Sequence, residues 1–94
     1  MSNGRVVMRE VESWEEMKGP GDYIMATRQD GTPFPIIVCP GCSRALSCSN
    51  HTTIQVKPLT IRASFLCQQR VARDGVAGTC GYHCMITNGV MEPC

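Results

Sequence analysis

Two cysteines two residues apart, in the run Cys39-Pro40-Gly41-Cys42, constrain this chain more than any other feature of its sequence. The run follows the apolar residues 35–38, which predicts a turn at the end of a strand. Two thiolates at this spacing can face one tetrahedral ion, and Gly41 lets backbone amides approach the sulfurs. A closed structural site of this kind needs two further ligands, which must come from elsewhere in the chain.

The second half of such a site is predicted from Cys80-Gly81-Tyr82-His83, which repeats the spacing and again has Gly after the first Cys. A tight turn would bring Cys80 and His83 together, whereas strand alternation would place Cys80 and Cys84 on one face. We predict that one Zn²⁺ is held by two such pairs, with Cys84 as the alternative to His83. The predicted ligands are Cys39, Cys42, Cys80 and His83.

The remaining cysteines are expected to serve other purposes. We interpret Cys48 as a loop thiol, Cys67 as a core residue and Cys94 as a terminal residue, because a buried free cysteine behaves as a small hydrophobe. His51 has no partner at ligand spacing and is expected to be a surface or hydrogen-bonded histidine. A thioredoxin-like redox pair at Cys39 would need a long helix after Cys42, and the segment that follows is short and polar.

The length of the chain favours one domain that needs a further stabilising element besides its core. The 94 residues have room for a single unit, residues 1–94, and a core of this size is marginal by itself. An odd number of cysteines, seven, fits metal ligation in a reducing compartment better than a disulfide framework. The sequence shows no secretory signal and no apolar segment of membrane-spanning length. We therefore expect a cytoplasmic protein with no membrane partner.

Alternating apolar and polar residues predict strands along most of the chain. The clearest run is 59–67, in which every second residue from Leu59 to Cys67 is apolar. Asn88-Gly89 predicts a type I′ hairpin between 82–87 and 90–92. Ser13 and Glu16 match a capping box, but Gly19 limits any helix there to about one turn. Further strands are expected at 5–11, 23–28, 35–39 and 52–57, and a loop at 69–78.

The predicted fold class is mainly β, a small zinc-ribbon-like antiparallel domain with at most one short helix. An enzyme is disfavoured, because four protein ligands leave the metal no open position for water, and no phosphate loop or nucleophile motif is present. We expect a module that binds another protein. The alternative is a nucleic-acid-binding zinc protein, since residues 41–94 carry five basic against two acidic side chains. The basic residues are Arg44, Lys57, Arg62, Arg70 and Arg73.

Four segments follow one another along the chain: Pro20–Asp22, Ile36–Cys42, Leu59–Phe65 and Cys80–Gly89. Together they resemble a family of small, functionally uncharacterised proteins from bacteria and their phages that are expected to bind metal. The resemblance spans residues 20–90 and implies the same four ligands named above, a β fold and a phage or mobile-element origin. The chain departs from the family pattern in three ways: Ala63-Ser64-Phe65 replaces a Pro-Ser-Ile element, Cys84 replaces an aromatic residue, and the loop before Cys80 is long.

Overall fold

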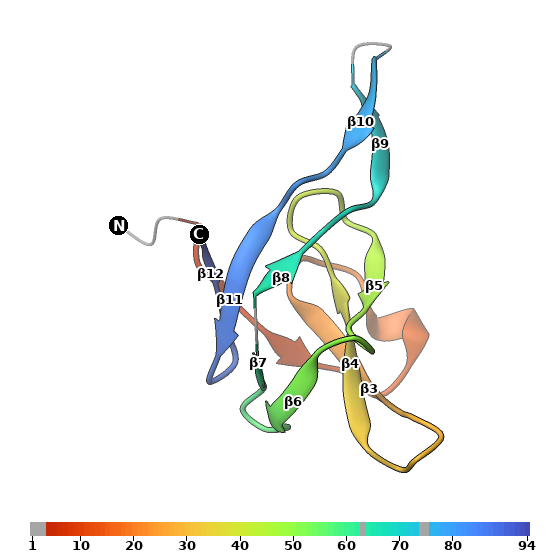
Figure 1. Cartoon of the computed structure of the whole chain (residues 1–94), viewed down its shortest axis with the longest axis vertical. Coiled ribbons are helices and arrows are strands. Elements are labelled where there is room, and N and C mark those ends of the chain that lie inside the picture. The colour runs from red at the N-terminus through yellow and green to blue at the C-terminus, as the bar shows by residue number, and fades with distance from the viewer. Residues whose placement is uncertain (1–3, 63, 74–75) are drawn as a thin grey trace.

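The computed structural model describes residues 4–62, 64–73 and 76–94 (Figure 1). The predicted inward position of Ala63, and residues 74–75 of the predicted loop, lie outside this part of the chain. The predicted fold class is confirmed, because the described residues form mainly antiparallel strands. Their one helical element is a single 3₁₀ turn, η1 (Trp14–Glu16). Ser13 is the N-cap residue of this turn, and the Glu16 N–H donates to its carbonyl at 3.1 Å. Its Oγ meets Glu16 Oε1 at 3.2 Å and caps no backbone N–H, so the side-chain bonds of the predicted capping box are not formed.

One four-stranded sheet carries the first cysteine pair at its end. Its order is β2 (Arg9–Glu10), β3 (Asp22–Thr27), β4 (Pro33–Val38) and β5 (Ala45–Ser47). The β3–β4 hairpin closes at Gly31, whose φ of 89° suits glycine. Within β4, Ile37 is fully buried beside Tyr23 of β3, which fixes the face that points to the core. Cys39 directly follows this strand.

A second four-stranded sheet contains the C-terminal hairpin. Its order is β1 (Val6–Val7), β12 (Val90–Pro93), β11 (His83–Thr87) and β8 (Phe65–Leu66). The predicted hairpin is present, with Asn88 and Gly89 at φ of 51° and 77°, as a type I′ turn requires. Cys84 and Ile86 alternate inward on β11 and are fully buried.

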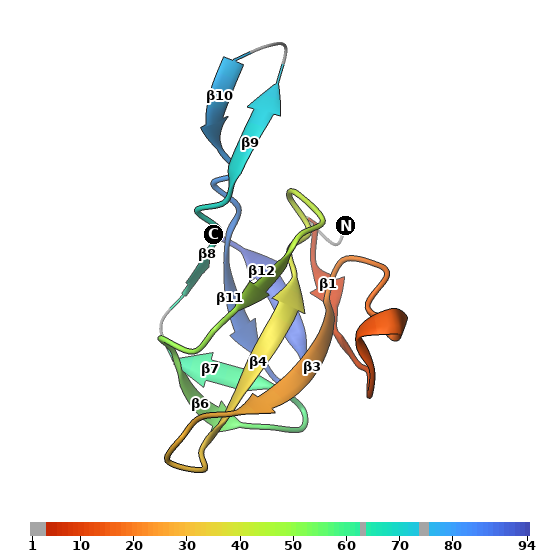
Figure 2. The same ribbon diagram turned by 90° about the vertical axis from the view of Figure 1, so that its right-hand side faces the viewer.

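Two further hairpins complete the chain. The strands β6 (Thr52–Gln55) and β7 (Thr60–Arg62) pair with each other beside the first sheet. The predicted strand 59–67 is not continuous, because Ser64 belongs to neither β7 nor β8. The predicted loop at 69–78 is wrong, because β9 (Arg70–Arg73) and β10 (Val76–Thr79) pair antiparallel. An Asp-Gly pair in a sequence is a signal of tight hairpins as well as of loops. This hairpin, here called the arm, projects from the body in both views (Figures 1 and 2).

The hydrophobic core lies between the inner faces of the two larger sheets and β7. The alternation predicted for 59–67 holds on both sides of the interruption, since Leu59, Ile61, Phe65 and Cys67 are all buried. Cys48 lies in the connection between β5 and β6, as predicted for a loop thiol, and it is also fully buried in the core. The other large members of the core are Tyr23, Ile37, Ile86 and Met91.

The Pro20-Gly21-Asp22 element has a structural role at the edge of the first sheet. Gly21 has φ of 83°, and a Cβ there would lie 2.6 Å from Val6 Cγ1, so a side chain does not fit. The buried Asp22 carboxylate accepts hydrogen bonds from Arg9 and from the backbone N–H groups of Lys18 and Gly19. The hydrogen bond from Arg9 is the main reason that the pKa of Asp22 falls to about 2.

Candidate metal centre

Four cysteine sulfurs converge where the two larger sheets meet the base of the arm. The Sγ atoms of Cys39, Cys42, Cys67 and Cys80 all lie within 4.8 Å of one another. Cys39 and Cys80 are 3.7 Å apart, and so are Cys42 and Cys67. A tetrahedron with metal–sulfur bonds of about 2.3 Å has sulfur–sulfur edges of roughly 3.8 Å. The spacing of the sulfurs therefore suits a single tetrahedral ion, and three of the four residues are among the ligands predicted from the sequence.

The first pair is held by a tight turn after β4. The N–H of Ser43 donates to the carbonyl of Cys39 at 2.8 Å, and the N–H of Cys39 donates to the carbonyl of Arg44 at 2.9 Å. The Gly41 N–H points at Cys39 Sγ, 3.3 Å away. A Cβ at Gly41 would lie 2.7 Å from Cys80 Sγ and 2.9 Å from Tyr82 Cβ, so only glycine fits between the two halves of the site.

The second pair is aligned by backbone hydrogen bonds at the base of the arm. The N–H of Cys80 donates to the carbonyl of Gln69 at 2.8 Å, and the N–H of Gly81 donates to the carbonyl of Cys67 at 3.0 Å. Cys67 in turn donates its N–H to the carbonyl of Tyr82 at 2.8 Å. These bonds place Cys67 and Cys80 side by side although the whole arm lies between them in sequence.

The structure does not place His83 among the four sulfurs. His83 begins β11, so the chain after Gly81 is extended and does not close the tight turn that the Cys80-x-x-His83 spacing suggested. Its exposed ring lies with Nε2 2.6 Å from Ser64 Oγ. The alternative ligand, Cys84, points to the opposite side of the strand and is buried in the core. The fourth member of the cluster is Cys67.

The sequence did not predict Cys67 as part of the site, because Cys67 is the last residue on the inward face of a predicted strand. A signal for it does exist in the sequence, since a cysteine that closes an apolar strand occurs twice, as Val38-Cys39 and as Leu66-Cys67. In both places the chain leaves the core directly after the cysteine, and the sulfur is at the end of the buried face. Cys39 is fully buried and Cys67 is 1% exposed, whereas Cys42 and Cys80 are half-buried.

The electrostatics of the site favour a bound cation. Burial raises the pKa of Cys39 and Cys67, against backbone N–H groups that act to lower both values. Burial acts the same way on Cys42, but there the N–H of Arg44 and the neighbouring thiols outweigh it and the pKa is lowered. Without an ion, burial therefore favours the protonated thiols of Cys39 and Cys67. A dication removes this penalty, because a coordinated thiol is deprotonated outright.

The other three cysteines and His51 lie outside the cluster of four sulfurs. Burial raises the pKa of Cys48 and of Cys84 to about 12, so both remain protonated in the core. Cys94 is exposed, as expected for a terminal residue. His51 is half-buried, with Nε2 2.9 Å from the carbonyl oxygen of Ser64, whereas its buried Nδ1 has no hydrogen-bond partner among the described residues.

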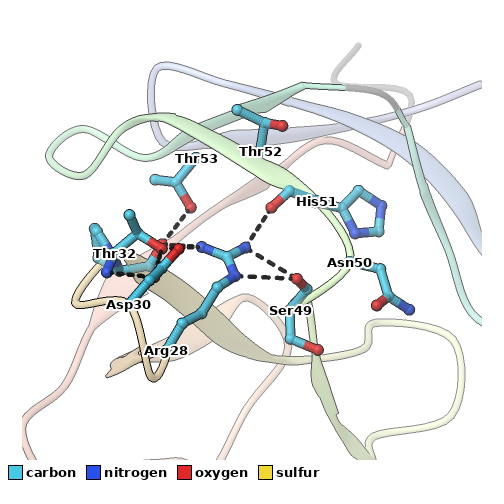
Figure 3. A pocket seen from close by; sticks show the side chains of 9 residues that line it. Arg28, Asp30, Thr32, Ser49, Asn50, His51, Thr52 and Thr53 are labelled. Atoms are coloured by element: carbon cyan, nitrogen blue, oxygen red, sulfur yellow. Dashed lines mark hydrogen bonds between the residues drawn. The ribbon is translucent and has the colours of Figure 1, made fainter.

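A surface hollow beside the β3–β4 turn gathers many polar side chains, but its only cation is engaged by the fold (Figure 3). The Arg28 guanidinium donates to the carbonyls of Pro33, Ser49 and His51 and to the Thr32 hydroxyl. It also lies 5.3 Å from the Phe34 ring centroid. Arg28 therefore ties the hairpin to the β5–β6 connection and leaves little capacity for a ligand.

In the described part of the chain, no helix has the length and apolar character to cross a membrane. Comparisons of the chain with protein-family models, with curated proteins and with solved structures find no significant match.

Proposed function

We propose that this protein is a small zinc-ribbon-like module, without enzymatic activity, that binds one Zn²⁺ through four thiolates and presents its β surface to another protein. The observation that carries the proposal is the convergence of Cys39, Cys42, Cys67 and Cys80 within 4.8 Å. Three of these residues also follow from the sequence spacing. A reducing cytoplasm would keep all four sulfurs available to the metal.

Zinc is preferred to other metals because the donor set is closed and entirely sulfur. Tetrahedral four-sulfur sites are typical of zinc and of iron. Zinc has no redox chemistry and commonly serves as a folding ion in sites of this composition. Four protein ligands also saturate the ion, so no position is left for an activated water or a substrate. The site therefore supports a structural role in place of a catalytic one.

The arm is the feature best suited to contact a partner protein. Among the described residues, β9 and β10 pair only with each other, and they project from the body (Figures 1 and 2). An isolated two-stranded hairpin is only marginally stable in water. Here its two ends are the ligand Cys80 and the segment after the ligand Cys67, so the metal would anchor the arm. Its uncovered strand edges are suited to pairing with an extended segment of another protein.

A protein partner is preferred to nucleic acid because the basic residues are dispersed. Arg44, Lys57, Arg62 and Arg70 are exposed, but they belong to four different segments, and the second half of the chain has a net charge of only +3 (five basic minus two acidic). Nucleic-acid surfaces normally carry denser basic clusters. By resemblance alone, the partner would be a phage protein or a protein of the bacterial host.

The metal content of the purified protein tests the first part of this proposal. Protein purified under reducing conditions should contain one zinc per chain by elemental analysis. X-ray absorption at the zinc edge should show four sulfur neighbours at about 2.3 Å. A folded sample without metal, a sample that contains iron, or a shell with a nitrogen at about 2.0–2.1 Å would each contradict the proposed centre.

The arm itself provides a test of the second part. A variant in which a short glycine linker replaces residues 70–79 should keep its zinc, because none of the four ligands is removed. Its binding to proteins captured from the native host should be lost, while Arg62→Ala, an exposed change on β7, should retain them. Capture that is unaffected by shortening the arm would refute its role. Capture that weakens steeply with salt and depends on nucleic acid would favour the alternative.

A further inference from the structure

We propose that the zinc centre is also a peroxide-responsive switch, in which oxidation expels the ion and joins its ligands as the disulfides Cys39–Cys80 and Cys42–Cys67. This inference rests on the proposed metal centre and concerns its regulation. In both pairs the two sulfurs lie 3.7 Å apart. Each pair connects the turn after β4 with the base of the arm.

Both pairs combine a half-buried cysteine with a fully buried or nearly fully buried one. Cys80 is half-buried and its neighbour Cys39 is fully buried. Cys42 is half-buried and its neighbour Cys67 is 1% exposed. A small oxidant from solvent can therefore reach one sulfur of each pair, and the buried sulfur is in position to complete the reaction. Oxidation susceptibility of cysteine follows thiolate character and exposure, and metal ligation supplies the first of these.

The chemistry is balanced with hydrogen peroxide as the oxidant. The accessible thiolate attacks one peroxide oxygen, the O–O bond breaks, and a sulfenic acid forms while the other oxygen leaves as water after protonation. The buried thiolate then attacks the sulfenic sulfur, the S–S bond forms, and the S–O bond breaks to release a second water. For both pairs, four thiolates, two peroxides and four protons give two disulfides and four waters. The zinc, which is not oxidised, leaves as Zn²⁺.

The pairing matters because it preserves the connection that the ion made. Disulfides within each half, Cys39–Cys42 and Cys67–Cys80, would leave the β4 turn unlinked to the arm. The cross-pairs instead keep the two halves joined after the metal has gone. The oxidised protein is therefore expected to be free of metal but still folded around its arm, which distinguishes oxidation from removal of the metal by a chelator.

Peroxide titration of the zinc-loaded protein tests this inference. Zinc release, followed with a chromogenic chelator, should be complete at two peroxides per ion, and a thiol reductant with added zinc should restore the centre. After tryptic digestion without reduction, peptide 29–44 should be joined to both 63–70 and 74–94. Fragmentation between Cys39 and Cys42 then assigns each partner. Cys94→Ser, at an exposed thiol outside the cluster, should behave as wild type.

Several results would overturn the switch and leave the metal centre intact. These are zinc retained at excess peroxide, release accompanied by sulfinic acids in place of disulfides, and peptide 29–44 recovered alone with an internal disulfide. A protein that contains no zinc before oxidation would instead refute the proposed centre. The two failures are thus separated by the metal analysis of the starting sample.

Discussion

A chelator added at neutral pH under reducing conditions should abolish the cooperative unfolding transition of this protein. Structural zinc contributes an apparent binding free energy of about 10–16 kcal/mol in small domains. The net free energy of unfolding of such a domain is about 5–15 kcal/mol. The free energy lost with the ion is therefore comparable to the entire stability of the domain. Here the ion would join the end of β4, the end of β8 and the end of the arm, and the core alone is small. Thermal unfolding followed by circular dichroism measures the effect.

Cys39→Ser should have the same result as chelation, because it removes a fully buried ligand. The matched control is Cys94→Ser, at an exposed cysteine outside the cluster, which should unfold like the wild type. Readdition of zinc should restore the transition in the chelated wild type and not in Cys39→Ser. If the chelated protein keeps its full thermal transition, the metal has no structural role.

The second large effect separates Cys67 from His83 as the fourth ligand. Cys67→Ser should lose its stoichiometric zinc and with it the folded state, because it removes a sulfur 3.7 Å from Cys42. His83→Ala should keep one zinc per chain and lose only the hydrogen bond to Ser64, a cost of about 0.5–1.5 kcal/mol. Elemental analysis and thermal unfolding of the two variants, purified side by side, distinguish these outcomes.

Cys84→Ala provides the control for a buried thiol outside the site. It should retain zinc and cost roughly 1–2 kcal/mol, since it removes a small group from the core. Loss of zinc from His83→Ala, with full retention in Cys67→Ser, would restore the ligand set expected from sequence spacing. Loss of zinc from Cys84→Ala would support the four-thiolate alternative that includes that residue.

Local signals in the sequence predicted most of the β structure. Residue alternation identified the inward face from Leu59 to Cys67, and Asn88-Gly89 identified the C-terminal hairpin. The arm was not predicted, because its Asp-Gly signal and small residues are shared by loops and by tight hairpins. Pairing is what distinguishes the two, and the antiparallel register of β9 with β10 is a property of the folded chain.

For the cluster of four cysteines, the sequence by itself determined the first pair, because Cys39 and Cys42 are brought together by one short turn whose geometry depends only on the residues within it. It also indicated Cys80. Only the tertiary structure decided the fourth position. Cys67 is 25 residues from Cys42 in the chain, and it reaches the site because β8 pairs with β11, with Leu66 opposite His83. That register holds His83 in an extended strand outside the cluster. Cys67 directly follows the end of β8, and its sulfur lies inside the cluster. Contacts between distant segments depend on how strands pair and pack, which no local spacing encodes.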